Sequence, residues 1–190
     1  DEARTAVEHA RQQVAALIHT DPRGVVFTSG ATESNNLAIK GAANFYKSRG
    51  KHIITVKTEH KAVLDTCKRL GKHGCRVTYL PLGRDGLINL DGLRQAVTEQ
   101  TILISIMHAN NEVGTIQPIE EISKIAKKRG IVFHTDAAQS VGKIGTRVDD
   151  LGIDLLSIAG HKVYAPKGIG ALYIRKGTPI EPLIHGAGHE

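Results

Sequence analysis

The stretch Ile102-Leu103-Ile104-Ser105-Ile106-Met107 decides the fold. All of its residues except Ser105 are apolar, so it lacks the alternation of a strand that has one face in water. A short, continuous apolar run is typical of a strand that other elements cover on both faces. Strands of this kind belong to parallel sheets between two layers of helices, and the stretch therefore predicts an α/β protein.

Strand and helix patterns alternate on both sides of this stretch. Asp91 and Pro118 mark two of the helix starts, Asp91 as a cap and Pro118 as a first helical residue. The alternation predicts a three-layer α/β/α domain over residues 1–190 with a mostly parallel, mixed sheet. We expect further strands at residues 25–28, 52–56, 76–80, 131–135, 155–158 and 170–175, and helices at about 3–18, 32–48, 61–72, 91–97 and 118–130.

The connection before the last strand is unusually short. Only the segment around Pro166–Gly170 separates the strand at 155–158 from the strand at 170–175. A parallel neighbour needs a long crossover, normally a helix, and none fits into this segment. We therefore expect the last strand to turn back and run antiparallel.

The composition is that of an ordinary globular protein, with 41% hydrophobic and 23% charged residues. The net charge is +6, and the densest basic cluster, Lys124–Arg129, lies at the end of a predicted helix, where cations complement the helix dipole. No aromatic residues lie among these charges, and no apolar stretch is long enough to span a membrane. We expect neither a nucleic acid nor a membrane as a partner.

The two cysteines, Cys67 and Cys75, belong neither to a Cys-x-x-Cys pair nor to zinc-finger spacing. We interpret both as structural thiols, and unpaired thiols favour a reducing compartment. We expect a cytoplasmic protein, or one of the mitochondrial matrix if it is eukaryotic. The histidines show no recognisable metal spacing, so no metal site is expected. The chain opens at Asp1 without a Met and ends just after a Gly-Ala-Gly loop, as expected of a piece of a longer protein.

Polar and titratable side chains gather directly after the predicted strands. In an open α/β sheet, ligands bind outside the carboxyl ends of the strands, so these side chains are candidates for one site. They are the turn Ser29-Gly30-Ala31-Thr32, His60, Asn110-Asn111-Glu112, Asp136 with Gln139, and His161-Lys162.

Each candidate has a chemical interpretation and a structural alternative. The turn at 29–32 opens a helix, where backbone N–H groups favour a phosphate, although a plain helix cap also explains it. Asp136 suits a protonated pyridine nitrogen, yet it can also be a cap or a solvated acid. Lys162 can form a Schiff base when its amine is neutral, but a typical lysine is a surface charge. His60 can stack on a ring or transfer a proton, or it can be structural. Their shared position at one edge of the sheet favours a cofactor site.

Five motifs in this order closely resemble those of the cysteine desulfurases, which are aminotransferase-class-V, fold-type-I pyridoxal-phosphate enzymes. The resemblance covers nearly the whole chain and is closest to the iron–sulfur-cluster and nitrogen-fixation type. It implies a homodimer that removes sulfur from L-cysteine, leaves alanine, and passes a persulfide to a sulfur-acceptor or scaffold protein. The motifs are Ser29-Gly30-Ala31-Thr32-Glu33-Ser34-Asn35-Asn36, Thr58-Glu59-His60, Asn110-Asn111-Glu112-Val113-Gly114, His134-Thr135-Asp136-Ala137-Ala138-Gln139 and Gly160-His161-Lys162.

The resemblance implies roles for the residues around the cofactor ring. Lys162 holds pyridoxal phosphate covalently and later moves protons at the substrate α-carbon. His60 stacks on the pyridine ring and helps with proton transfer. Asp136 pairs with the pyridine nitrogen, and Gln139 bonds the ring hydroxyl.

The resemblance also implies a phosphate site, with one departure. The backbone of Ala31, together with Thr32 and His161, holds the phosphate, and Asn111 lies beside the cofactor and the substrate carboxylate. Many relatives have Ser where this chain has Ala159, and that Ser contacts the phosphate. Losing one donor is expected to weaken cofactor binding by about 1 kcal/mol or more. Some nitrogen-fixation-type members also have Ala at this position.

The family's catalytic Cys lies on a mobile loop far beyond Lys162, outside this chain. Most of the small domain also lies outside it, as does a Thr that reaches the phosphate of the partner subunit. We therefore expect residues 1–190 to form the pyridoxal-phosphate-binding large domain, and we expect this piece alone not to sustain persulfide formation.

Two alternatives stay open at this point, and a third is disfavoured. A selenocysteine lyase has a similar cofactor site, and a non-catalytic cofactor-binding fragment fits the missing Cys. A nicotinamide-binding Rossmann domain is disfavoured, because Gly168-Ile169-Gly170 precedes a strand and lacks the third glycine.

Overall fold

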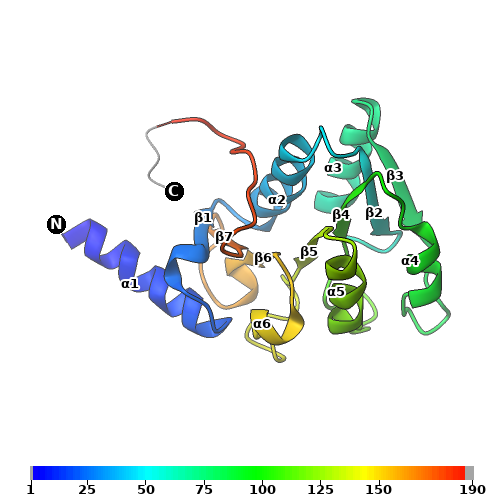
Figure 1. The fold of residues 1–190 in the computed structure, drawn as a ribbon. Helices are drawn as coiled ribbons and strands as arrows, with labels where there is room; N and C mark the ends of the chain where they lie inside the picture. Colours follow the sequence, from blue (N-terminus) through cyan, green and yellow to red (C-terminus); the bar gives the residue numbers. More distant parts are fainter. Residues whose placement is uncertain (1, 187–190) are drawn as a thin grey trace.

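A seven-stranded sheet runs through the computed structural model, which describes residues 2–186 (Figure 1). The strand order is β1-β7-β6-β5-β4-β2-β3. The sequence-based strands are confirmed to within a few residues at each end. Their bounds are β1 Val25–Thr28, β2 His52–Val56, β3 Arg76–Leu80, β4 Thr101–Ser105, β5 Val132–Asp136, β6 Leu155–Ala159 and β7 Gly170–Ile174.

The sheet is parallel except at β7. Strands β2 to β6 pair in parallel with one another, whereas β7 pairs antiparallel with both β6 and β1. The expected antiparallel last strand is therefore confirmed. The position of β7 in the sheet was not expected. This strand lies between β1 and β6, so that β1 joins the sheet only through β7.

Helices cover both faces of the sheet, as the continuous apolar strands require (Figure 1). On one face, α2 and α3 pack on a core that includes Ile53, Leu103 and Leu155. On the other face, α1, α4, α5 and α6 pack on a second core that includes Ile104 and Phe133. The helix bounds are α1 Glu2–Leu17, α2 Ala31–Phe45, α3 Lys61–Lys72, α4 Leu90–Ala96, α5 Ile119–Lys128 and α6 Val148–Leu151. This arrangement is the expected three-layer α/β/α fold.

Several helix ends differ from the sequence-based prediction. Asp91 does not cap α4, because Asn89 does so by accepting a hydrogen bond from the Gly92 N–H at 2.8 Å. Pro118 is the cap of α5 and not its first helical residue. Helix α2 ends at Phe45, three residues before the predicted end. Helix α6 was not predicted, since a helix of 4 residues is too short to show periodicity.

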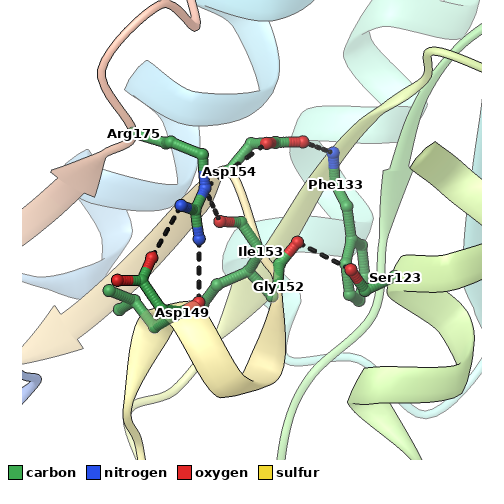
Figure 2. Close-up of polar contacts among 8 residues, drawn as sticks. Ser123, Phe133, Asp149, Gly152, Ile153, Asp154 and Arg175 are labelled. Carbon is green, nitrogen blue, oxygen red and sulfur yellow. Dashed lines mark hydrogen bonds and ion pairs between the residues drawn. The ribbon is translucent and has the colours of Figure 1, made fainter.

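A cluster of polar contacts lies at the amino ends of the parallel strands, on the side of the sheet opposite their carboxyl ends. Figure 2 shows Arg175, directly after β7, reaching the α6 segment and the start of β6. Its guanidinium donates to Asp149 Oδ1 at 2.8 Å, to Val148 O at 2.9 Å and to Ile153 O at 2.8 Å. Asp154 in turn accepts from the Phe133 N–H at 2.9 Å. Arg175 thereby ties the only antiparallel strand of the described sheet to its neighbours.

Candidate functional site

A cavity of about 510 Å³ opens at the carboxyl ends of the parallel strands. Its walls come from the segments that follow β1, β2, β4, β5 and β6, as the topology of an open α/β sheet predicts. The structure brings the residues with an expected role at the cofactor together around this one cavity, although their chemical roles stay predictions. These residues are Ala31, Thr32, His60, Asn111, Asp136, Gln139, His161 and Lys162. Two of the candidates, Asn110 and Glu112, line a neighbouring cavity instead.

The turn between β1 and α2 forms one wall of the cavity. Gly30 caps α2 with a φ of 154°, and no side chain hydrogen bonds to the first turn of the helix as a cap. Glu33 braces the turn by accepting hydrogen bonds from the Ser29 N–H at 2.8 Å and the Ser29 hydroxyl at 2.6 Å. The Thr28 and Ser34 hydroxyls, 2.8 Å apart, hold it from the buried side. The N–H groups of a 15-residue helix are thus presented in a fixed turn, which is a suitable place for an anion.

Asp136 ends β5 and is buried, with 5% of its surface exposed. Its carboxylate accepts hydrogen bonds from the Asn35 amide at 2.7 Å and from the Ala138 N–H at 2.9 Å. Burial raises the pKa of Asp136, while these two hydrogen bonds and the nearby His60 pull the pKa down. The result is a well-held carboxyl group at the floor of the cavity.

His60 directly precedes α3 and is exposed where it lines the cavity. Its Nδ1 accepts a hydrogen bond from the Ala62 N–H at 3.1 Å, so His60 is the cap of this helix. The cap fixes the ring and engages one of its nitrogens. Nε2 is therefore the nitrogen through which His60 can exchange a proton.

Lys162 closes a single 3-10 turn, Gly160–Lys162, directly after β6. Its side chain is exposed in the described chain and lines the cavity together with His161. Gly160 permits this turn, because a Cβ at this position would lie 2.6 Å from the Ile169 carbonyl oxygen. Ala159 also lines the cavity, and its methyl side chain offers no hydrogen-bond donor.

Asn111 and Gln139 lie at the rim of the cavity. Asn111 is exposed, and the preceding Asn110 shapes its turn by accepting hydrogen bonds from the Glu112 and Val113 N–H groups, both at 2.9 Å. The Gln139 Oε1 accepts from the Lys143 ammonium at 3.2 Å. The Gln139 side chain is thus held by a local contact and the Asn111 turn by Asn110, and both residues line the site from different loops.

Four further residues that sequence reasoning missed bear on the site. Lys167 and Glu33 line the cavity, and Asn35 orients Asp136. Glu59 is buried directly before His60. Glu33 lies at the third position of α2, the usual place for a glutamate that braces a helix start, and this signal was available in the sequence. Asn35 lies within the motif at residues 29–36, but no sequence pattern indicates its contact with Asp136, and none marks Lys167.

The cysteines are poorly suited to react. Cys67 is fully buried on α3, and burial raises its pKa to about 12. Cys75 is partly buried, and burial raises its pKa as well. Within residues 2–186, no three His, Cys, Asp or Glu side chains are arranged to hold a metal ion. The helices of this part of the chain are also too short or too polar to cross a membrane.

Curated proteins of similar sequence include cysteine desulfurases. "Cysteine desulfurase IscS" of Dictyoglomus turgidum is 59% identical over 189 residues, which is 100% of this chain and 48% of that protein. Its counterpart from Ehrlichia chaffeensis is 59% identical over 191 residues, covering 99% of this chain and 47% of that protein. The chain thus spans about half the length of the curated relatives it matches.

Solved structures show the same fold. The structure described as "SspA in complex with cysteine" superposes with a TM-score of 0.95 at 49% identity, over 99% of this chain and 55% of that one. A "NIFS-LIKE PROTEIN" superposes with a TM-score of 0.95 at 46% identity, over 99% of this chain and 52% of that one. The family model described as "Aminotransferase class-V" matches residues 1–189. The chain therefore belongs to the class-V aminotransferase family.

Proposed function

We propose that this chain is the pyridoxal-phosphate-binding large domain of a cysteine desulfurase, with Lys162 as the residue that holds the cofactor. The observation that carries the proposal is the single cavity that gathers Thr32, His60, Asp136 and Lys162 from four separate strand ends. The cysteine desulfurases among its relatives support the choice of reaction. One of its structural neighbours is SspA in complex with cysteine.

The donors around the cavity fit pyridoxal phosphate. The start of α2 has no side-chain cap, and a Cβ added at Gly30 would meet nothing within 4 Å, which leaves room for a phosphate against the helix. Asp136 is a buried carboxyl that two N–H groups hold in place, which suits a pyridine nitrogen. Lys162 supplies a primary amine at the same cavity.

When bound, the cofactor supplies an electron sink for negative charge at the substrate α-carbon. Ala31, Thr32 and His161 would hold its phosphate, and Gln139 its ring hydroxyl. Asp136 would keep a negative charge beside the ring nitrogen. Lys162 and the Nε2 of His60 would move protons at the substrate, and Asn111 would orient the substrate carboxylate. Each group is held by its own strand end, so that the geometry is fixed before substrate binds.

The sulfur acceptor has to come from outside this chain in the proposed reaction. A thiol takes up sulfur as a thiolate, and both cysteines here have pKa values raised by burial. The proposal therefore includes a catalytic Cys on the remaining half of the protein, a homodimer, and an acceptor or scaffold protein that receives the persulfide. A cytoplasmic location is part of the same proposal and agrees with two free thiols.

Turnover of L-cysteine and L-selenocysteine by the intact protein tests the reaction. We expect alanine release and enzyme-bound persulfide from cysteine. Turnover of selenocysteine with no turnover of cysteine would instead support a selenocysteine lyase. Residues 1–190 alone are expected to release no alanine in repeated turnovers, and sustained release by this piece would contradict the assignment of the acceptor.

A further inference from the structure

Glu59 is a buried carboxyl group that the proposed reaction does not use. It is 5% exposed and lies between the end of β2 and the start of α3. Its Oε1 accepts a hydrogen bond from the Met107 N–H at 2.6 Å, and its Oε2 is buried without a hydrogen-bond partner among the described residues. A charged carboxylate that is left half-satisfied in the interior is costly, so this arrangement requires an explanation.

The contact with Met107 joins two walls of the cavity. Glu59 directly precedes His60, and Met107 lies two residues after the end of β4, with both His60 and Met107 lining the site. The Asn110 amide adds a second link, since it donates to the Thr58 carbonyl at 3.2 Å. Glu59 therefore fixes the turn that carries His60 against the segment that carries Asn111.

The surroundings of Glu59 decide where a proton sits. The negative charge of Asp136 on β5 raises the pKa of Glu59, and the charge of Glu59 in turn raises the pKa of Cys67 on α3. Two adjacent carboxyl groups in a buried site do not both ionise easily. Glu59 also lines a neighbouring cavity of about 560 Å³, where further charged or titratable groups are Lys57, His60, Lys61 and Glu112.

Asp136 is better placed than Glu59 to carry the charge. Asp136 accepts two N–H hydrogen bonds, at 2.7 and 2.9 Å, whereas Glu59 accepts one. Hydrogen bonds to the ionised form stabilise that form. Burial and the repulsion from Asp136 also raise the pKa of Glu59 well above its usual range. The pair thus favours a neutral Glu59 next to a charged Asp136.

We propose that Glu59 is a positioning residue that stays protonated, so that the negative charge of this buried pair rests on Asp136 while Glu59 holds the His60 turn against the end of β4. The part that concerns His60 rests on the proposed function. The protonation state does not, because it is a property of the chain itself.

Infrared difference spectra of the purified protein without added cofactor test the protonation state. Wild type minus Glu59→Gln is expected to show, at neutral pH, the carbonyl band of one protonated carboxylic acid, which shifts in D₂O. Carboxylate bands in place of this band would overturn the proposal. This result stands whether or not the protein binds pyridoxal phosphate.

Cofactor titration tests the positioning role. Gln keeps an oxygen acceptor for Met107 without charge, so Glu59→Gln is expected to bind pyridoxal phosphate within about twofold of wild type. Glu59→Leu loses the acceptor and is expected to bind about tenfold more weakly. Equal losses in both variants would overturn the proposal. If circular dichroism shows that Glu59→Leu does not fold, the Gln variant alone decides: affinity near wild type supports the role, and a tenfold loss contradicts it.

Discussion

At the residue scale, Gly170 sets how closely β7 approaches the turn at the start of α2. A Cβ at Gly170 would lie 2.7 Å from Gly30 Cα and 2.7 Å from the Ile158 carbonyl oxygen. All of these are backbone atoms, which cannot rotate out of the way as a side chain can. The proposed phosphate turn can thus lie this close to β7 only because residue 170 has no Cβ.

Gly170→Ala is therefore expected to lower the free energy of unfolding by about 1–3 kcal/mol, because the methyl group forces strand and turn apart. The displaced turn should also bind pyridoxal phosphate more weakly. Urea unfolding and a cofactor titration measure the two effects. Gly145→Ala is the matched control, since a Cβ at Gly145 meets nothing within 4 Å. If Gly170→Ala and Gly145→Ala lowered the free energy of unfolding equally, the close approach at Gly170 would not be what sets the stability there.

His134 gives a residue-scale prediction about pH. Its ring is buried on β5, with Nδ1 2.8 Å from the Ser105 hydroxyl and Nε2 3.0 Å from the Ser157 hydroxyl. Burial lowers its pKa to about 3, and burial also lowers the pKa of His52 to about 4. A histidine held neutral takes up its proton only on unfolding. The low pKa of the folded state therefore leaves the free energy of unfolding unaffected above pH ~6.5 and lowers it as pH falls from there towards the folded-state pKa.

Between pH ~6 and ~4, His134 should make the free energy of unfolding fall by up to about 1.4 kcal/mol per pH unit. His134→Asn should flatten that part of the wild-type curve, whatever its effect on stability at neutral pH. Urea unfolding across this range, with the exposed His9→Asn as the control, measures the slopes. A His134→Asn curve parallel to that of wild type would contradict the assignment of a neutral buried ring.

At the element scale, the sequence predicted the strands better than the helix ends. Nearly continuous apolar runs such as Ile102–Ile106 mark buried strands directly, and the short link before β7 indicated the direction of that strand. The cap of α4 was assigned to Asp91 although Asn89 holds it, because both residues are good caps two positions apart. The insertion of β7 beside β1 depends on long-range pairing, which no local pattern encodes.

Arg175 is the element-scale prediction, since it links β7 to α6 and the start of β6 (Figure 2). Its hydrogen bonds to Asp149 Oδ1, Val148 O and Ile153 O need the planar fork of a guanidinium. Arg175→Lys is expected to lower the free energy of unfolding by about 2 kcal/mol, because a lysine cannot reach all three acceptors. The control is Arg94→Lys, whose ion pair with Asp91 is exposed and should change stability by less than about 0.5 kcal/mol. A loss for Arg175→Lys no greater than that of the control would show that the fork is dispensable.

At the scale of the whole molecule, binding groups and structural ties lie at opposite edges of one sheet. The carboxyl ends of the parallel strands carry the cavity, while the Arg175 cluster closes the other edge. Topology alone predicted that the residues after the strands meet, and most of them do line one cavity, while Asn110 and Glu112 line its neighbour. Asn35 and Glu59 lie within the quoted motifs, but their hydrogen bonds to Asp136 and Met107 were not predictable, because each bond joins segments that are far apart in the sequence.

The central claim is that Lys162 holds pyridoxal phosphate, and visible absorption of the purified protein with added cofactor tests it most directly. After free cofactor is removed, wild type should keep the band of a lysine-linked cofactor. Lys167→Ala, which removes the other lysine that lines the cavity, should keep the band too. Lys162→Ala should lose it. A band that survives in Lys162→Ala would contradict the account.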